Sequence, residues 1–279
     1  MTKKTFYLIS YLLPLIIIQI LGAFVGILFY LLKKNTNNIL IKNIRASQTD
    51  INNSTLAWAL IRNICESGKT IIESIIIWIS SQERVLTWVH SVEGEAEILK
   101  AQKKNRGIIF LTPHLGCYEI APIYYGASFP ITLLYRPSRK KWLNDLMVAG
   151  RKKGLVRLAP TSRAGIKSIL LALQKGEAVG ILPDQLANKG EGEWAPFFNR
   201  PALTMTLVGR LVKKTNATII MVFAERMTFG RGFIIHLETI EGNDIDTPGK
   251  LNFQLEKQIK RNPMQYLWNY DRHKGHESQ

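Results

Sequence analysis

Residues 108–119 read IIFLTPHLGCYE, and this segment indicates how the larger part of the chain is built. A short apolar run leads into Pro113, which has no backbone N–H to donate and therefore ends a strand. His114 follows in the turn, ahead of Glu119. Open α/β sheets bind their ligands at such turns, at the carboxyl ends of buried parallel strands. The segment therefore predicts both a strand and a candidate site.

Through the rest of the chain, short apolar runs alternate with longer amphipathic stretches. The runs predict strands at 107–111, 131–135, 178–182, 218–223 and 233–237. The amphipathic stretches predict helices near 138–153, 164–174, 204–214 and 250–261. This alternation is typical of an α/β fold with a mainly parallel central sheet flanked by helices, and it places one domain at 105–279.

His114 and Glu119 form a candidate acid–base pair. Neutral imidazole accepts a hydroxyl proton near pH 7, and a carboxylate bonded to its other nitrogen fixes the tautomer and the orientation. In one regular helix the two side chains would lie about 140° apart, so the pairing requires His114 to precede the helix. The spacing alone leaves open a turn histidine beside a solvated glutamate.

The N-terminal region contains an uncharged run at 6–32, within a predicted membrane anchor at 1–34. As a helix it would be roughly 40 Å long, which exceeds the ~30 Å hydrocarbon core of a bilayer. A cleaved signal peptide has a shorter apolar region of about 7–15 residues. We therefore expect a single-pass transmembrane helix, although Pro14 leaves a kinked or interfacial segment open.

Basic side chains on both sides of this run predict its orientation. Lys3 and Lys4 precede it, and more basic residues follow it: Lys33, Lys34, Lys42 and Arg45. Because positive charge accumulates on the cytoplasmic side, the main domain is expected in the cytoplasm. Between anchor and domain, 35–53 is expected to be a polar connector and 54–104 to be helical, with Ser54 or Thr55 as its cap.

The composition excludes several classes of protein. With 46% hydrophobic residues the chain is too apolar to be disordered, and Cys65 and Cys117 alone cannot form a disulfide framework or a zinc site. The 37 Lys and Arg outnumber the 21 Asp and Glu, which gives a net charge of +16. This charge indicates an anionic partner: nucleic acid, a membrane surface, an acidic protein or a phosphorylated substrate.

An ordered series of motifs narrows these choices. After His114 and Glu119 (H-x4-E) come YRP at 135–137, Arg151 ahead of Gly154, GILPDQ at 180–185, APFFNRPALT at 195–204, FAER at 223–226 and QYLW at 265–268. With this series the chain resembles the lipid A biosynthesis acyltransferase family, within the lysophospholipid acyltransferase superfamily. It departs from the family at Cys117-Tyr118, where Asn-Trp is common, and at Asn199, where glycine is usual. Asparagine tolerates left-handed backbone geometry, so the turn at Asn199 is expected to survive.

The resemblance implies a glycerolipid acyltransferase-like fold and the transfer of a fatty acyl group from acyl carrier protein to a hydroxyl of a lipid A precursor. In that reaction His114 is the expected general base, oriented by Glu119. The expected substrate-binding residues are Arg136, Arg151, Asp184, Gln185 and Arg200. The resemblance implies the inner membrane as location, acyl carrier protein and an anionic lipid as partners, and no metal or tightly bound cofactor. Cys117 is expected to be a packing residue rather than a nucleophile.

Three alternatives remain. The first is an acyltransferase acting on another phospholipid or glycolipid, with acyl-CoA as a further option for the donor. The second is a membrane-tethered nucleic-acid-binding protein, which the charge allows but no RNP, helix-turn-helix or zinc pattern supports. The third is a catalytically inactive scaffold, against which the joint presence of His114, Glu119, Arg151 and Asp184 argues. The motifs leave the acyl-chain length and the acylated hydroxyl open.

Overall fold

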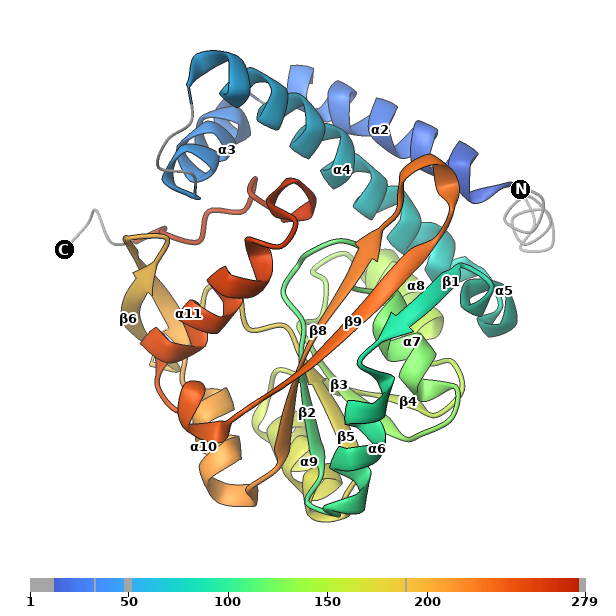
Figure 1. Ribbon diagram of the computed structural model, residues 1–279, viewed down its shortest axis with the longest axis vertical. Helices are drawn as coiled ribbons and strands as arrows, with labels where there is room; N and C mark the ends of the chain where they lie inside the picture. The colour runs from blue at the N-terminus through green and yellow to red at the C-terminus, as the bar shows by residue number, and fades with distance from the viewer. Residues whose placement is uncertain (1–12, 33, 48–51, 189, 276–279) are drawn as a thin grey trace.

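The computed structural model describes residues 13–32, 34–47, 52–188 and 190–275 (Figure 1). The helices are α2 (Leu15–Leu32), α3 (Lys34–Ser47), α4 (Asn53–Ile79), α5 (Gln82–Leu86), α6 (Glu95–Lys103), α7 (Ile120–Gly126), α8 (Lys141–Arg151), α9 (Arg163–Gln174), α10 (Leu207–Thr215) and α11 (Pro248–Ile259). The strands are β1 (Val89–Glu93), β2 (Ile108–Leu111), β3 (Ile131–Tyr135), β4 (Val156–Pro160), β5 (Ala178–Ile181), β6 (Gly192–Phe197), β7 (Arg200–Met205), β8 (Thr218–Arg226) and β9 (Phe233–Ile240). The described residues also form 3₁₀ turns at η1 (Thr228–Gly230), η2 (Gly242–Asp244) and η3 (Pro263–Gln265).

A seven-stranded sheet with the order β1-β9-β8-β2-β5-β3-β4 forms the centre. Every neighbouring pair is parallel except β8 and β9, which are antiparallel. Strands β2 and β5 lie in the middle and are buried at every position, as continuous apolar runs in a parallel sheet should be. The predicted α/β fold with a mainly parallel sheet is confirmed, and each predicted strand is present within a few residues.

The two faces of the sheet bury two separate cores, because successive side chains along a strand point to opposite faces. In β2, Ile109 and Leu111 pack with side chains of α9, α10 and α11, whereas Ile108 and Phe110 pack with side chains of α6 and α7. Helices therefore cover both faces, and the carboxyl end of the parallel strands stays available for a site.

Helix α2 lies lengthwise along α4 (Figure 1). Glycines allow this close approach: a Cβ built on Gly68 of α4 would lie 2.1 Å from the carbonyl oxygen of Gly22 on α2. The opposite face of α2 exposes large apolar side chains, among them Ile20, Phe24 and Leu28. Within the described residues, α2 is the one helix long and apolar enough to cross a bilayer, with a mean hydropathy of 2.6.

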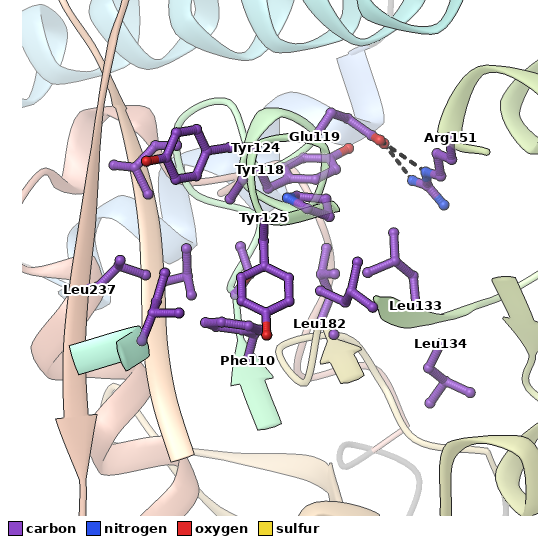
Figure 2. A pocket seen from close by; sticks show the side chains of 18 residues that line it. Phe110, Tyr118, Glu119, Tyr124, Tyr125, Leu133, Leu134, Arg151, Leu182 and Leu237 are labelled. Carbon is purple, nitrogen blue, oxygen red and sulfur yellow. Dashed lines mark hydrogen bonds and ion pairs between the residues drawn. The ribbon is translucent and has the colours of Figure 1, made fainter. Parts of the chain in front are cut away.

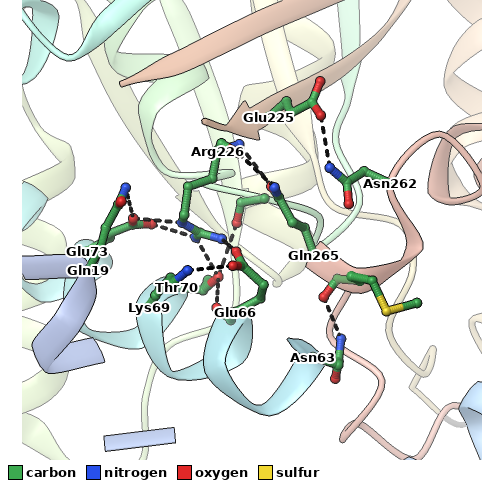
Figure 3. A network of polar contacts seen from close by, with 12 residues as sticks. Gln19, Asn63, Glu66, Lys69, Thr70, Glu73, Glu225, Arg226, Asn262 and Gln265 are labelled. Atoms are coloured by element: carbon green, nitrogen blue, oxygen red, sulfur yellow. Dashed lines mark hydrogen bonds and ion pairs between the residues drawn. The ribbon is translucent and has the colours of Figure 1, made fainter. Parts of the chain in front are cut away.

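A buried ion-pair network joins α2, α4 and β8 (Figure 3). Arg226 on β8 donates to both carboxylate oxygens of Glu73 and to Glu66, both on α4. Glu73 in turn accepts a hydrogen bond of 3.1 Å from Gln19 of α2. Gln19 also accepts from the backbone N–H of Gly230, so polar contacts fix α2 to the domain at a defined register.

The region before β2 differs from the prediction. The stretch 35–53, expected to be a polar connector, is helical over α3, and its residues 48–51 lie outside the described part. The stretch 54–104 is helical except that the edge strand β1 interrupts it. Helix α4 is capped by Asn52, whose side chain accepts from the Thr55 N–H, and not by Ser54 or Thr55. Lys3 and Lys4, on which the orientation argument depends, also lie outside the described residues.

Strands β6 and β7 form a separate antiparallel hairpin beside α11. The turn that joins them consists of Phe198 and Asn199, which have φ values of 48° and 59°. Positive φ at both central positions is typical of a type I′ hairpin turn, in which asparagine is well tolerated. The expectation that Asn199 preserves this turn is therefore confirmed.

Candidate functional site

His114 lies in the irregular turn between β2 and α7, as the sequence predicts. Backbone contacts hold this turn on both sides: the carbonyl of His114 accepts from the N–H of Leu267, and Cys117 donates to the carbonyl of Ala224. Gly116 has a φ of 62°, and a Cβ there would lie 2.0 Å from the Ala224 oxygen. Only glycine fits this position, so the turn that presents His114 is tightly fixed.

Asp184 is the partner of His114. Its Oδ1 lies 2.8 Å from His114 Nδ1, and its Oδ2 accepts the His114 backbone N–H at 2.8 Å. Burial acts to raise the pKa of Asp184, but the facing His114 side chain and its hydrogen bonds outweigh burial and hold the pKa below its ordinary value. The carboxylate is therefore ionised and can only accept, so Nδ1 carries a hydrogen, and a neutral ring has its lone pair at Nε2.

The prediction that Glu119 orients His114 is wrong, because Asp184 occupies that position. Glu119 is 2% exposed and accepts two hydrogen bonds from Arg151, one of them 2.9 Å from Nε to Oε2. Burial acts to lower the pKa of Arg151, but the Glu119 carboxylate outweighs it and raises the pKa. Asp184 follows β5 and His114 follows β2, and these strands are neighbours in the sheet. Adjacency of the strands, and not proximity in the sequence, therefore selects the partner.

Gln185 and Tyr118 complete the immediate surroundings of His114. The Gln185 side-chain nitrogen lies 3.1 Å from His114 Nε2 and donates to its lone pair. The Tyr118 ring meets the imidazole edge-on, with the ring centroids 4.7 Å apart. Sequence reasoning placed Gln185 among the substrate-binding residues and did not assign Tyr118 a role, although it directly precedes Glu119.

An apolar cavity with about 630 Å³ of empty space lies next to this group (Figure 2). The Glu119–Arg151 pair lies along one edge of the cavity. Thr112 also lines it, as does Tyr118, whose ring contacts His114. Apolar side chains from the sheet and from α6 and α7 form most of its walls, among them Phe110, Leu133, Leu182, Val222, Ile98 and Tyr125. Sequence reasoning did not locate these walls, because facing side chains on different strands carry no common motif.

Two other predicted binding residues lie elsewhere. Arg136 follows β3, is exposed, and donates to the Asn188 side chain at 2.8 Å. Arg200 begins β7 and donates to Asn43 of α3 at 2.9 Å. Arg200 therefore takes part in the contact between the hairpin and α3, and it does not line the apolar cavity.

The Cys117 thiol is buried, and burial followed by the charge of Glu73 raises its pKa well above the ordinary value. A reactive cysteine instead has a lowered pKa and partial exposure. Among the described residues, no three His, Cys, Asp or Glu side chains are grouped as metal ligands would be. A neutral imidazole at His114 can accept a proton at Nε2, and the neighbouring Tyr118 connects it to the apolar cavity.

The chain is similar in sequence to known proteins. The family model described as bacterial lipid A biosynthesis acyltransferase matches residues 4–275. The lipid A biosynthesis palmitoleoyltransferase of Escherichia coli (strain K12) is 27% identical over 267 residues, which cover 94% of this chain and 86% of the relative. The lauroyltransferase of the same organism is 25% identical over 268 residues, covering 94% and 87%. A lipid A biosynthesis acyltransferase of Haemophilus influenzae is 26% identical over 272 residues, covering 94% and 86%.

Proposed function

The chain belongs to the bacterial lipid A biosynthesis acyltransferase family, and on this premise we propose that it moves a fatty acyl group from acyl carrier protein to a hydroxyl of a lipid A precursor. The observation that carries the proposal is the His114–Asp184 pair, whose neighbour Tyr118 contacts the imidazole and lines the apolar cavity. A base with a fixed tautomer beside a hydrocarbon site is what a hydroxyl attack on a fatty thioester requires.

The proton moves through His114 in this mechanism. The acceptor hydroxyl displaces the Gln185 amide from Nε2 and gives its proton to that nitrogen while its oxygen attacks the thioester carbonyl. Asp184 stabilises the imidazolium that forms. When the carbon–sulfur bond breaks, the thiolate of the carrier arm takes the proton from Nε2. The products are an ester and a free thiol, and the enzyme returns to its starting state without a covalent intermediate.

Glu119 and Arg151 act at the edge of the cavity. Two hydrogen bonds from Arg151 to one carboxylate fix the guanidinium in place, and bidentate pairs of this kind set orientation as well as charge. The remaining N–H donors of the fixed guanidinium support binding of an anionic group of a substrate at this edge. Glu119 is then a positioning residue for Arg151.

The net charge of the protein supports the choice of acyl donor. The net charge is +16, and exposed basic side chains lie at the N-terminus of α8, including Arg139, Lys140 and Lys141. A positive surface attracts an acidic partner over several ångströms and speeds its association. This supports acyl carrier protein, which is acidic, as the source of the acyl group.

The location assigned to the enzyme is the bacterial inner membrane, with the catalytic domain on the cytoplasmic side. The apolar, exposed face of α2 supports membrane attachment. The basic residues that follow α2 in the sequence support the orientation. Because α2 is packed along α4, membrane attachment holds the whole domain close to the lipid that it modifies.

Mass spectrometry of the products tests the proposal. The detergent-solubilised protein is incubated with a tetra-acylated lipid A precursor and acyl carrier protein thioesters of several chain lengths, beside a His114→Ala control. We expect a mass gain of one acyl chain that the control lacks. Parallel reactions contain acyl-CoA as donor or a lysophospholipid as acceptor. A mass gain confined to either of these reactions would overturn the proposed donor or acceptor.

A further inference from the structure

A second hollow, here called the basic groove, lies at the carboxyl ends of β3 and β5, between α9 and α10. It has about 1210 Å³ of empty space and is distinct from the apolar cavity. Its floor contains the apolar side chains of Ile166, Leu170, Met205 and Leu211. Its rim contains four cationic side chains: Arg136, Arg163, Arg210 and Lys214.

Among the described residues, none of the rim cations forms an ion pair with a carboxylate. Among the described residues that line the groove, Glu191 is the one anionic side chain, and it accepts a hydrogen bond from Asn188. Arg163, Arg210 and Lys214 are exposed and make no ion pair within the described residues. Like charges gathered around one hollow repel each other, and an anion bound between them removes that repulsion. Arginine in particular binds phosphate through a planar set of donors.

The groove and the apolar cavity approach His114 through different neighbours. Gln185 contacts His114 Nε2, and the next residue, Leu186, lines the groove. Tyr118 contacts the imidazole ring and lines the apolar cavity. Leu134 lines both hollows. Each hollow is thus linked to His114 through a neighbouring residue, and a reaction with two substrates has two candidate sites.

The chemistry of the two sites differs, and this difference decides their occupants. The walls of the apolar cavity consist mostly of apolar side chains, which suit a hydrocarbon chain. The groove combines an apolar floor with a cationic rim, which complements a ligand that carries both alkyl chains and phosphate. We propose that the basic groove binds the acceptor, a phosphorylated and acylated glycolipid, with its phosphate on the rim and a chain on the floor. This inference rests on the proposed function, which supplies the acceptor.

Kinetics of rim variants test the proposal. Arg163→Gln, Arg210→Gln and Lys214→Gln are compared with Lys213→Gln, a neighbouring exposed lysine that does not line the groove. We expect each rim variant to raise the KM for the acceptor about tenfold or more, since hydrogen bonds to charged groups are strong. The KM for the acyl donor and kcat should stay within about twofold, and Lys213→Gln should behave like the wild type. A rise in the donor KM alone would overturn the proposal and assign the groove to the donor's phosphopantetheine.

Binding without turnover separates this inference from the proposed reaction. The His114→Ala protein is titrated with a bisphosphorylated lipid A precursor and with its dephosphorylated form, with and without Arg210→Gln. We expect Arg210→Gln to weaken binding of the phosphorylated ligand at least tenfold and of the dephosphorylated ligand little. Equal effects on both ligands, or none, would overturn the groove assignment. Selective weakening supports the groove even where the wild type transfers no acyl group, an outcome that would sink the proposed reaction alone.

Discussion

Both carboxylate oxygens of Asp184 accept hydrogen bonds from His114, one from its backbone N–H and one from its imidazole. Asp184 itself is only 2% exposed. Tyr266 lies beside it, and burial followed by the nearby Asp184 carboxylate raises the pKa of that phenol well above its ordinary value. The buried charge of Asp184 is thus compensated by hydrogen bonds, as buried charges require. His114 donates from Nδ1 because its carboxylate partner can only accept.

Glu119 differs from Asp184 in its function, since its charge compensates the charge of Arg151. We predict that Glu119→Gln lowers the free energy of unfolding by about 3 kcal/mol, because it leaves a buried guanidinium without its counter-ion. Denaturant unfolding in a fixed detergent measures this change. The control is Glu177→Gln, which breaks the more exposed pair with Arg157 and should cost less than about 1 kcal/mol. Equal stability of Glu119→Gln and the wild type would refute the role.

At the scale of elements, α2 and α4 behave as one unit. Their contact depends on Gly22, Gly26 and Gly68, where added side chains would meet backbone atoms. Packing of small residues is also how helices associate in lipid, where little hydrophobic drive acts between them. The network of Gln19, Glu73 and Arg226 then fixes this helix pair to β8 (Figure 3).

We predict that Gly68→Ala lowers the free energy of unfolding by about 1–3 kcal/mol, the usual cost of overpacking. Alanine is intrinsically favoured over glycine inside a helix by roughly 0.5–1 kcal/mol, so a loss would report the close contact alone. Gly249→Ala in α11 is the control, because a Cβ there meets nothing within 4 Å. It should leave stability unchanged or slightly raised. A stabilised Gly68→Ala protein would mean that α2 does not pack here.

Sequence patterns predict the elements that have a clear period and miss those that depend on distant partners. The runs that became β2 and β5 are apolar at every position, and only the centre of a parallel sheet suits them. Strand β4 was missed because exposed Arg157 interrupts its pattern at the edge of the sheet. Strands β6 and β7 were missed because each contains a proline.

The same reasoning explains the candidate site. His114, Asp184 and Gln185 were each selected from motifs, but the pairing of His114 with Asp184 depends on the order of strands in the sheet. The periodicity of apolar residues in the sequence does not predict the order of the strands in the sheet. Glu119 lies closer in the chain, and the geometry of the turn directs it to Arg151 on α8 instead.

At the scale of the whole molecule, the segment that contains His273 packs against the β6–β7 hairpin. His273 lies under the β6–β7 hairpin, where its Nδ1 donates to the carbonyl of Pro201 at 2.9 Å. Burial lowers the pKa of His273 to about 4. An unfolded chain has an ordinary histidine pKa of about 6.5, so between these values the unfolded state binds the extra proton. This residue therefore contributes stability above pH 6.5 that is lost as the pH falls towards 4.

We predict that His273→Gln reduces the loss of stability between about pH 6.5 and pH 4. Free energies of unfolding at pH 7, 5.5 and 4.5 measure the difference between the variant and the wild type. Glutamine keeps a side-chain donor for the Pro201 carbonyl but does not titrate in this range. The same pH dependence in both proteins would show that His273 is not the group responsible.

The most direct test of the catalytic account is a double-mutant cycle on kcat for acyl transfer, with His114→Ala, Asp184→Asn and the combined variant. We predict that each single change lowers kcat by about 10²–10⁴-fold and that the combined variant is no worse than His114→Ala alone, because the two residues act as one base. An Asp184→Asn protein that keeps kcat within about threefold of the wild type would contradict the account, as would losses that multiply in the combined variant.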